Sequence, residues 1–120
     1  MAFTLKVRDA IRLRASGHCE RCGVSVVDRP ASIHHRRPRG MGGSKSHEWE
    51  TPECGVVLCG TGTTGCHGYV ESNRAEAAEQ GWLVPRRDPR HPRDVPVFID
   101  PEWYLVTPFK LQPISLDPGF

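Results

Sequence analysis

The sequence has no long apolar run. Of its 120 residues, 38% are hydrophobic and 8% aromatic, and no segment is long enough to cross a bilayer. The first residues, from Met1 to Lys6, also lack the apolar segment of a secretory signal peptide. We therefore expect no membrane partner and a cytoplasmic location.

The sequence also has no internal repeat and no coiled-coil heptad, which argues against solenoids and long helical bundles. Glycine and proline are abundant instead, with 12 and 11 residues. A chain of this length and composition builds only a modest apolar core, and small chains often add a metal or disulfides to hold their fold. The sequence predicts one small, loop-rich unit with such a cross-link.

Excess charge of one sign is missing too, because the formal net charge is only +2. Cationic side chains nevertheless gather between Arg29 and Lys45, where five of them occur without any carboxylate. Such a segment suits the phosphates of a nucleic acid, although a solvated loop would have the same composition. The candidate DNA-binding residues are Arg36, Arg37, Arg39 and Lys45.

Hydrophobic periodicity predicts an N-terminal amphipathic helix over residues 7–16, which Gly17 ends. Short strands are predicted over 24–27 and 31–35, joined by a turn at 28–30. A third apolar strand is predicted over 55–59. These elements precede a region of helical character.

Residues 66–80 have a helical pattern, and Gly81 is a suitable residue to end that helix. Eight of the eleven prolines lie beyond residue 84, which excludes a long helix there. We expect residues 1–84 to form the domain. The segment 85–120 is then a Pro-rich C-terminal extension that packs on the core, with extended pieces at 95–98 and 103–106.

Five cysteines are present, and their odd number favours metal-bound thiolates over disulfides. Cys19 and Cys22 have the two-residue spacing of a tetrahedral zinc site. Cys59 ends a predicted strand and Cys66 begins a predicted helix, so this pair is the best candidate to complete a structural Zn²⁺ site. Pairing Cys54 with Cys59 is a less favoured alternative, and ordinary buried thiols are a third.

Two adjacent histidines, His34 and His35, end a predicted strand. Adjacent strand residues face opposite sides, so both can serve one site only where the chain bends at the strand end. His67 follows Cys66 directly, and a zinc knuckle would bring it toward this strand. Without that third imidazole, a surface histidine pair would be the simpler interpretation. Glu71, one helical turn after His67, is either a further ligand or a surface carboxylate.

Together these motifs resemble the HNH endonuclease family, and specifically its compact phage-type members with a four-cysteine zinc site. The resemblance covers residues 17 to about 75, roughly half the chain. It is carried by Cys19-x2-Cys22-Gly23, Ile33-His34-His35-x2-Pro38 with Gly42-Gly43, Val57-Leu58-Cys59-Gly60 and Gly65-Cys66-His67-Gly68. The implied fold is α+β, a small ββα-metal (His-Me finger) fold with a structural zinc knuckle.

The resemblance implies hydrolysis of DNA phosphodiester bonds, by nicking or by cutting both strands, in a monomer or homodimer. By position, His35 corresponds to the general base, and His34 and His67 correspond to ligands of a catalytic divalent ion. Histidine ligands tolerate Mg²⁺, Mn²⁺, Ni²⁺ or Zn²⁺ at such a site. Phage packaging proteins are further partners that the resemblance suggests.

One position departs from the family pattern. The middle Asn of the motif corresponds to Cys54, and the only asparagine in the chain, Asn73, lies on a predicted helix. A thiol is a poor replacement for an amide that both donates and accepts hydrogen bonds. The alternative function is therefore a non-catalytic zinc-binding module that interacts with DNA or protein.

Overall fold

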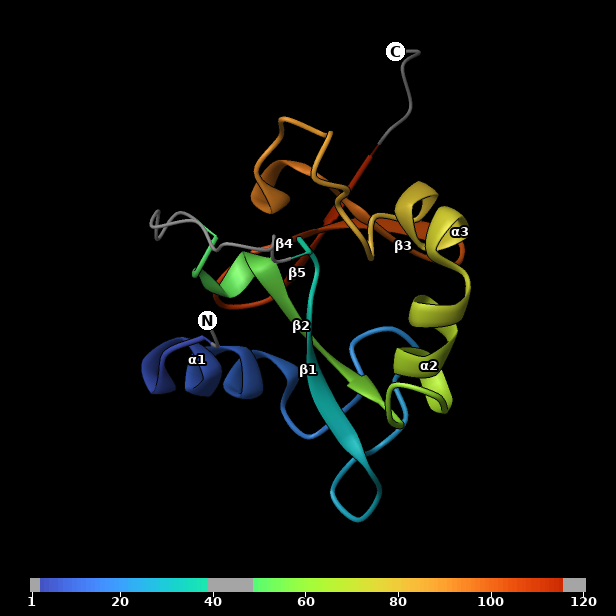
Figure 1. Ribbon diagram of the computed structural model, residues 1–120. Helices are drawn as coiled ribbons and strands as arrows, with labels where there is room; N and C mark the ends of the chain where they lie inside the picture. The colour runs from blue at the N-terminus through green and yellow to red at the C-terminus, as the bar shows by residue number, and fades with distance from the viewer. Residues whose placement is uncertain (1–2, 39–48, 116–120) are drawn as a thin grey trace.

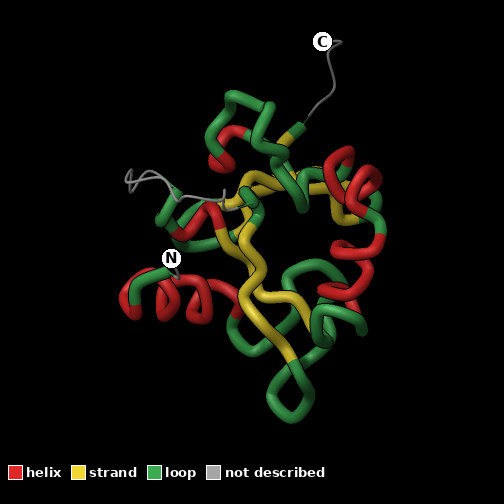
Figure 2. The backbone as a smooth tube through the Cα atoms, in the orientation of Figure 1, coloured by secondary structure: helices red, strands yellow, loops and turns green. Residues whose placement is uncertain are grey.

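A computed structural model describes residues 3–38 and 49–115, which form an α+β fold with two small antiparallel sheets (Figures 1 and 2). The α+β class predicted from the sequence is confirmed. The elements in chain order are α1 (Leu5–Ala15), β1 (Ala31–His35), the 3-10 turn η1 (Pro52–Cys54), β2 (Gly55–Cys59), α2 (Gly65–Ser72), α3 (Arg74–Glu79), the 3-10 turn η2 (Pro92–Asp94), β3 (Val97–Ile99), β4 (Glu102–Val106) and β5 (Leu111–Ile114). Among the described residues, no helix has the length and apolarity that a membrane span requires.

The first sheet consists of β1 and β2, paired antiparallel from Ala31 opposite Cys59 to His35 opposite Gly55. The first four residues of β2 are buried because α1 covers one face of the strand and α2 the other (Figure 1). The apolar run Val56-Val57-Leu58 is typical of such a strand. Within the described part of the chain, β1 pairs with β2 on one side, and no strand pairs with its other edge.

The prediction of a strand over residues 24–27 is wrong. This segment forms no ladder with β1, and its one bridge pairs Ser25 with His18. Val24 instead accepts a hydrogen bond from the amide of Cys19 and packs against the core. The segment thus closes the turn that contains Cys19 and Cys22, residues 18–25, which we call the cysteine turn. The partner of β1 is β2.

The single helix predicted over residues 66–80 is two helices, α2 and α3, which meet at Asn73. Asn73 has a non-helical ψ of 57°, and its side-chain amide donates to the carbonyl of Tyr69. Asparagine side chains compete with the helix for backbone groups in this way. The predicted helix end is correct, because Gly81 has a φ of 81° immediately after the turn that follows α3.

A buried ion pair fixes α1 to the cysteine turn. The guanidinium of Arg14 donates to both carboxylate oxygens of Glu20, at 2.7 and 2.8 Å, and both side chains are almost fully buried. Arg14 also donates to the carbonyl of Gly55, and Glu20 accepts from the amide of Val57. This network joins α1, the cysteine turn and β2.

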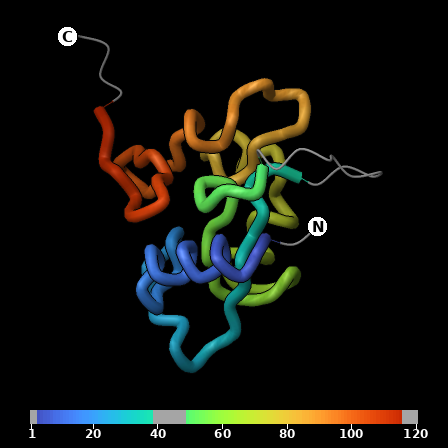
Figure 3. Tube along the Cα trace, turned by 90° about the vertical axis from the view of Figure 1, so that its left-hand side faces the viewer, coloured from blue at the N-terminus to red at the C-terminus, as the bar shows by residue number. Residues whose placement is uncertain are grey.

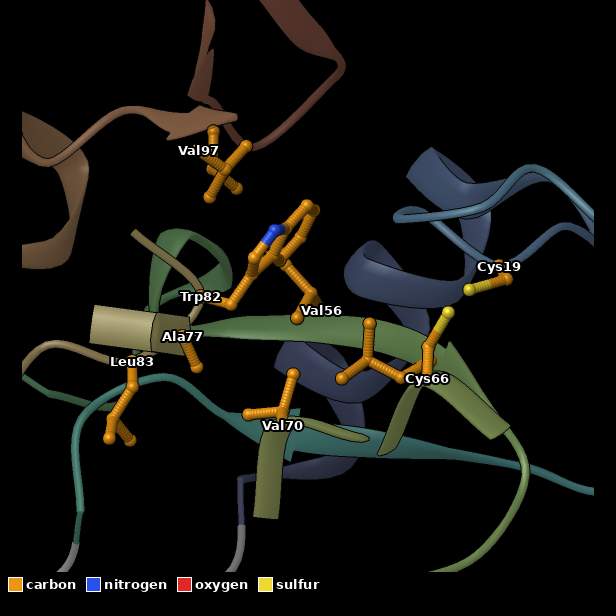
Figure 4. Packing of buried hydrophobic residues seen from close by; sticks show 10 residues of the cluster. Cys19, Val56, Cys66, Val70, Ala77, Trp82, Leu83 and Val97 are labelled. Carbon is orange, nitrogen blue, oxygen red and sulfur yellow. The ribbon is translucent and has the colours of Figure 1, made fainter. Parts of the chain in front are cut away.

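The C-terminal segment forms the second sheet, in the order β3–β4–β5, at the opposite end of the molecule from the 28–30 turn (Figure 3). The sequence predicted extended pieces near β3 and β4 but not β5. Val97 and Val106 are buried in the same cluster as Val56, Val70 and Trp82 (Figure 4). Residues of the extension therefore complete the main core.

The prediction that Arg36 binds DNA is wrong, because its side chain is completely buried. Its guanidinium donates to the carbonyls of Glu53, Gly81, Pro92 and Val95 at 2.6 to 3.1 Å. Burial lowers the pKa of Arg36 to about 9, so the group stays protonated at neutral pH. Arg36 joins the end of β1 to η1, to the turn after α3 and to the C-terminal extension.

The other cationic candidates have different surroundings. Arg37 donates to the carbonyls of Pro85, Arg86 and Asp88, and its guanidinium lies 4.2 Å from the ring centroid of Trp49. A phosphate would have to compete with these contacts. The remaining candidates, Arg39 and Lys45, lie outside the described residues.

Replacing Arg36 tests its structural role. We expect Arg36→Met to lower the free energy of unfolding by about 3–5 kcal/mol, because several buried carbonyls lose their donor. Urea denaturation at saturating zinc measures this, with the exposed Arg29→Met as the matched control at about 0.5 kcal/mol or less. A loss for Arg36→Met no larger than the control would contradict the assignment.

Candidate metal centres

The structure brings together the four cysteines that the sequence paired. The Sγ atoms of Cys19, Cys22, Cys59 and Cys66 all lie within 4.8 Å of one another, and those of Cys22 and Cys59 are 3.8 Å apart. In Figure 4 the sulfurs of Cys19 and Cys66 point toward one another. The arrangement is compatible with the structural zinc site expected from the spacing.

Backbone amides surround these sulfurs. The amide of Cys22 donates to Cys19 Sγ at 3.5 Å, and the amide of Cys66 donates to Cys59 Sγ at 3.4 Å. The guanidinium of Arg21, which stacks on a neighbouring tyrosine, donates to Cys66 Sγ at 3.3 Å. Such donors stabilise thiolates, the form in which cysteine binds a metal.

The long insert between the second pair of cysteines folds into a tight turn. Gly60 has a φ of 88°, and a Cβ atom there would lie 2.1 Å from the carbonyl oxygen of Thr64. A side chain at this position is therefore excluded by the backbone itself. The turn lets Cys59 and Cys66 remain neighbours although six residues separate them.

The pKa values of the cluster thiols depend on burial and on hydrogen bonds. Burial raises the pKa of Cys22 and Cys66. Burial also opposes ionisation of Cys19, but hydrogen bonds from backbone amides, that of Cys22 first, outweigh it and lower its pKa. Four thiolates this close repel one another unless a divalent cation lies between them. A set of four sulfurs is the ligand set typical of Zn²⁺.

Cys54 is not part of this cluster. It precedes β2 while Cys59 ends it, so the two lie at opposite ends of an extended strand. The buried Cys54 thiol lies 3.5 Å from Thr51 Oγ1 and 3.9 Å from His91 Nε2, and burial raises its pKa. The alternative pairing of Cys54 with Cys59 is therefore wrong.

A second cluster of ligand atoms lies between β1 and α2. His34, His67 and Glu71 each offer one atom, and these atoms lie within 4.8 Å of one another. His34 Nδ1 is 3.7 Å from Glu71 Oε1, and the two imidazole centroids are 5.6 Å apart. Two nitrogens and a carboxylate oxygen are ligands that Mn²⁺, Ni²⁺ and Zn²⁺ accept.

Hydrogen bonds leave one nitrogen of each imidazole available. His34 Nε2 lies 2.9 Å from the carbonyl of Trp82, which can only accept, so Nε2 carries the proton and Nδ1 keeps its lone pair. Burial lowers the pKa of His34 to about 4, which keeps the ring neutral at pH 7. His67 Nδ1 lies 2.7 Å from Ser32 Oγ, leaving Nε2. Metal-binding histidines commonly have such a partner on the other nitrogen.

A groove of about 460 Å³ lies over this cluster. Its lining includes His34, His35, His67, Glu71 and Arg74. His34 and His35 alternate along β1, yet both of them line this groove. The three predicted imidazoles thus surround a common space large enough for a phosphate group.

His35 has unusual surroundings. Its ring stacks on that of Phe3, with centroids 4.2 Å apart and planes 4° from parallel. Burial lowers the pKa of His35, and the buried Nε2 has no hydrogen-bond partner among the described residues. The neutral imidazole therefore keeps an unused nitrogen.

Sequence reasoning missed Ser32, Phe3 and the carbonyl of Trp82. Ser32 alternates with His34 on the strand and shares its face, a signal that could have suggested contact with the helix carrying His67. No local pattern connects Phe3 or Trp82 with the histidines. Tertiary structure alone brings these groups together.

Comparison with models of known protein families, with curated proteins and with solved structures gave no match. The case for a function therefore rests on the residues and geometry of the two clusters.

Zinc content tests the cysteine cluster. We expect wild type to hold one zinc per chain and Cys22→Ser to lose it, because an exposed ligand is removed with little change in packing. Cys54→Ser is the matched control and should retain the metal, as judged by metal analysis after gel filtration. Equal zinc loss in both variants would contradict the assignment.

Proposed function

We propose that the protein is a metal-dependent endonuclease of the HNH type that hydrolyses phosphodiester bonds in DNA. In this proposal His35 is the general base, and His34, His67 and Glu71 hold the catalytic divalent ion. The observation that carries it is the meeting of three imidazoles and a carboxylate at one groove. The order β1, β2, α2, with cysteines at the strand end and helix start, supports a ββα-metal fold.

The chemistry of the groove agrees with these roles. Phosphodiester hydrolysis needs a base that is neutral near pH 7 and positive charge near the phosphate. Burial lowers the pKa of His35, so its ring is neutral near pH 7, the form that a general base requires. A divalent ion would stabilise charge on the phosphate and the leaving oxygen. Three protein ligands would leave coordination positions for the substrate.

Arg74 adds a cation beside the candidate ligands. Its guanidinium lies 3.5 Å from Glu71 Oε2 at the groove and is about half exposed. An arginine so placed can bind an adjacent phosphate. With Arg36 buried, Arg74 takes its place among the cations that we propose contact DNA.

The second candidate function is a non-catalytic zinc-binding module that interacts with DNA or protein. Cys54 favours it, because its thiol stands at the motif's Asn position, and its partners among the described residues are Thr51 and His91. Such a module would bind zinc and a partner without cleaving DNA. The assay below separates the two functions.

The decisive assay uses supercoiled plasmid with Mg²⁺, Mn²⁺ or Ni²⁺. We expect the wild type to nick it, and His35→Ala to nick about 10²–10⁴-fold more slowly, because the general base is lost. His18→Ala, an exposed histidine in the cysteine turn, is the matched control. A wild type that keeps its zinc but leaves plasmid intact with every metal would favour the non-catalytic module.

Ser32 provides a separate test of the metal assignment. We expect Ser32→Ala to raise the Mn²⁺ concentration for half-maximal nicking about 10- to 100-fold, because His67 loses the partner that orients its ring. The rate at saturating Mn²⁺ should stay close to that of wild type. Ser25→Ala, in the cysteine turn, is the control, and equal metal requirements in both variants would count against His67 as a ligand.

A further inference from the structure

Two rings from distant parts of the chain are stacked face to face. Phe3, in the segment before α1, lies parallel to His35 at the end of β1, with centroids 4.2 Å apart. Phe3 is only 5% exposed and belongs to a buried cluster with Ile11 and Val57. The phenyl ring is therefore held by the core, while the imidazole borders the groove.

The space for this stack depends on Gly55, which lies directly opposite His35 in the β1–β2 register. A Cβ atom on Gly55 would lie 2.8 Å from Cε2 of Phe3 and 2.7 Å from Cδ1 of Ile11. Real Cβ atoms do not approach other atoms so closely. Any other residue at position 55 would thus displace the phenyl ring from its place beside the imidazole.

One nitrogen of the His35 imidazole is not held by a hydrogen bond. Among the described residues, the buried Nε2 of His35 has no hydrogen-bond partner, whereas His34 Nε2 and His67 Nδ1 each have one. A ring without such a bond can rotate about its side-chain torsions unless packing restrains it. The stack on Phe3 provides such packing.

We propose that Phe3 is the positioning residue for His35, holding its ring at the groove by stacking, and that Gly55 keeps the necessary space open. This inference rests on the proposed role of His35 as general base. Phe3 touches neither the groove nor the candidate ion and acts only through His35. Its loss should therefore lower kcat while leaving the KM for DNA unchanged.

The stack has a spectroscopic signature that is independent of activity. In the zinc-loaded full chain, the carbon-bound ring protons of His35, assigned by their absence in His35→Ala, should lie upfield because of the Phe3 ring current. Phe3→Leu keeps an apolar side chain but removes the ring, so these signals should move downfield toward those of exposed His18. Ile11→Val, in the same buried cluster, is the matched control and should leave them in place. Unshifted His35 signals in the wild type would overturn the inference.

Nicking kinetics then test whether the restraint serves catalysis. We expect Phe3→Leu and Gly55→Ala each to lower kcat about 10- to 100-fold at constant KM, since both misplace the base. The double variant should be no slower than either single one, because both remove the same contact. Ile11→Val should keep the wild-type kcat.

The positioning role of Phe3 and the nuclease function are contradicted by different results. A Phe3→Leu variant that loses the His35 shift but keeps the wild-type kcat, while His35→Ala is inactive, would overturn the positioning role. A wild type that shows the shift but never nicks DNA would overturn the proposed function and the catalytic purpose of the stack, and would support the stack as a packing feature only.

Discussion

The register between β1 and β2 is the constraint on which the candidate site depends. Side chains alternate along a strand, so a slip of one residue would exchange the two faces of β1. In the observed register His34 faces α2, and His35 lies opposite Gly55. The two faces of β2 fix this choice, because Val56 packs in the main core and Val57 packs with Phe3 and Ile11.

Two buried arginines, Arg14 and Arg36, connect helices, strands and loops by hydrogen bonds where a larger protein would use apolar packing. Arg14 binds Glu20 and several carbonyls, and Arg36 binds carbonyls from η1, from the turn after α3 and from the extension. A planar guanidinium with five donors can satisfy several strand and helix ends at once. Few apolar residues are needed at these junctions, which agrees with the low hydrophobic content of the chain.

The cysteine cluster and the groove share one helix. Cys66 is the second residue of α2, and His67 and Glu71 follow on the same helix. The sulfur of Cys66, in the first turn of α2, lies beside those of Cys19, Cys22 and Cys59, so the same short helix carries part of the cysteine cluster and two of the groove-lining side chains. The cysteine cluster and the proposed site of the catalytic ion are joined through this helix, and His34 reaches the second site from β1.

Local patterns in the sequence determined much of what lies close along the chain. Cysteine spacing indicated the four-sulfur cluster, and apolar periodicity indicated β1, β2 and the helix beside them. Adjacent His34 and His35, with His67 after Cys66, indicated the residues of the groove. These features depend on periodicity and on turns of a few residues, which a sequence displays directly.

Only the tertiary structure decided which distant groups meet. It buried Arg36, paired β1 with β2 instead of residues 24–27, and stacked Phe3 on His35. The bond from His34 to the carbonyl of Trp82 spans 48 residues. Every residue type carries a backbone carbonyl, so the sequence does not mark the one that accepts a given hydrogen bond. The sequence also does not distinguish a buried arginine from an exposed one. Such contacts arise from the packing of the whole chain, and therefore no short stretch of sequence encodes them.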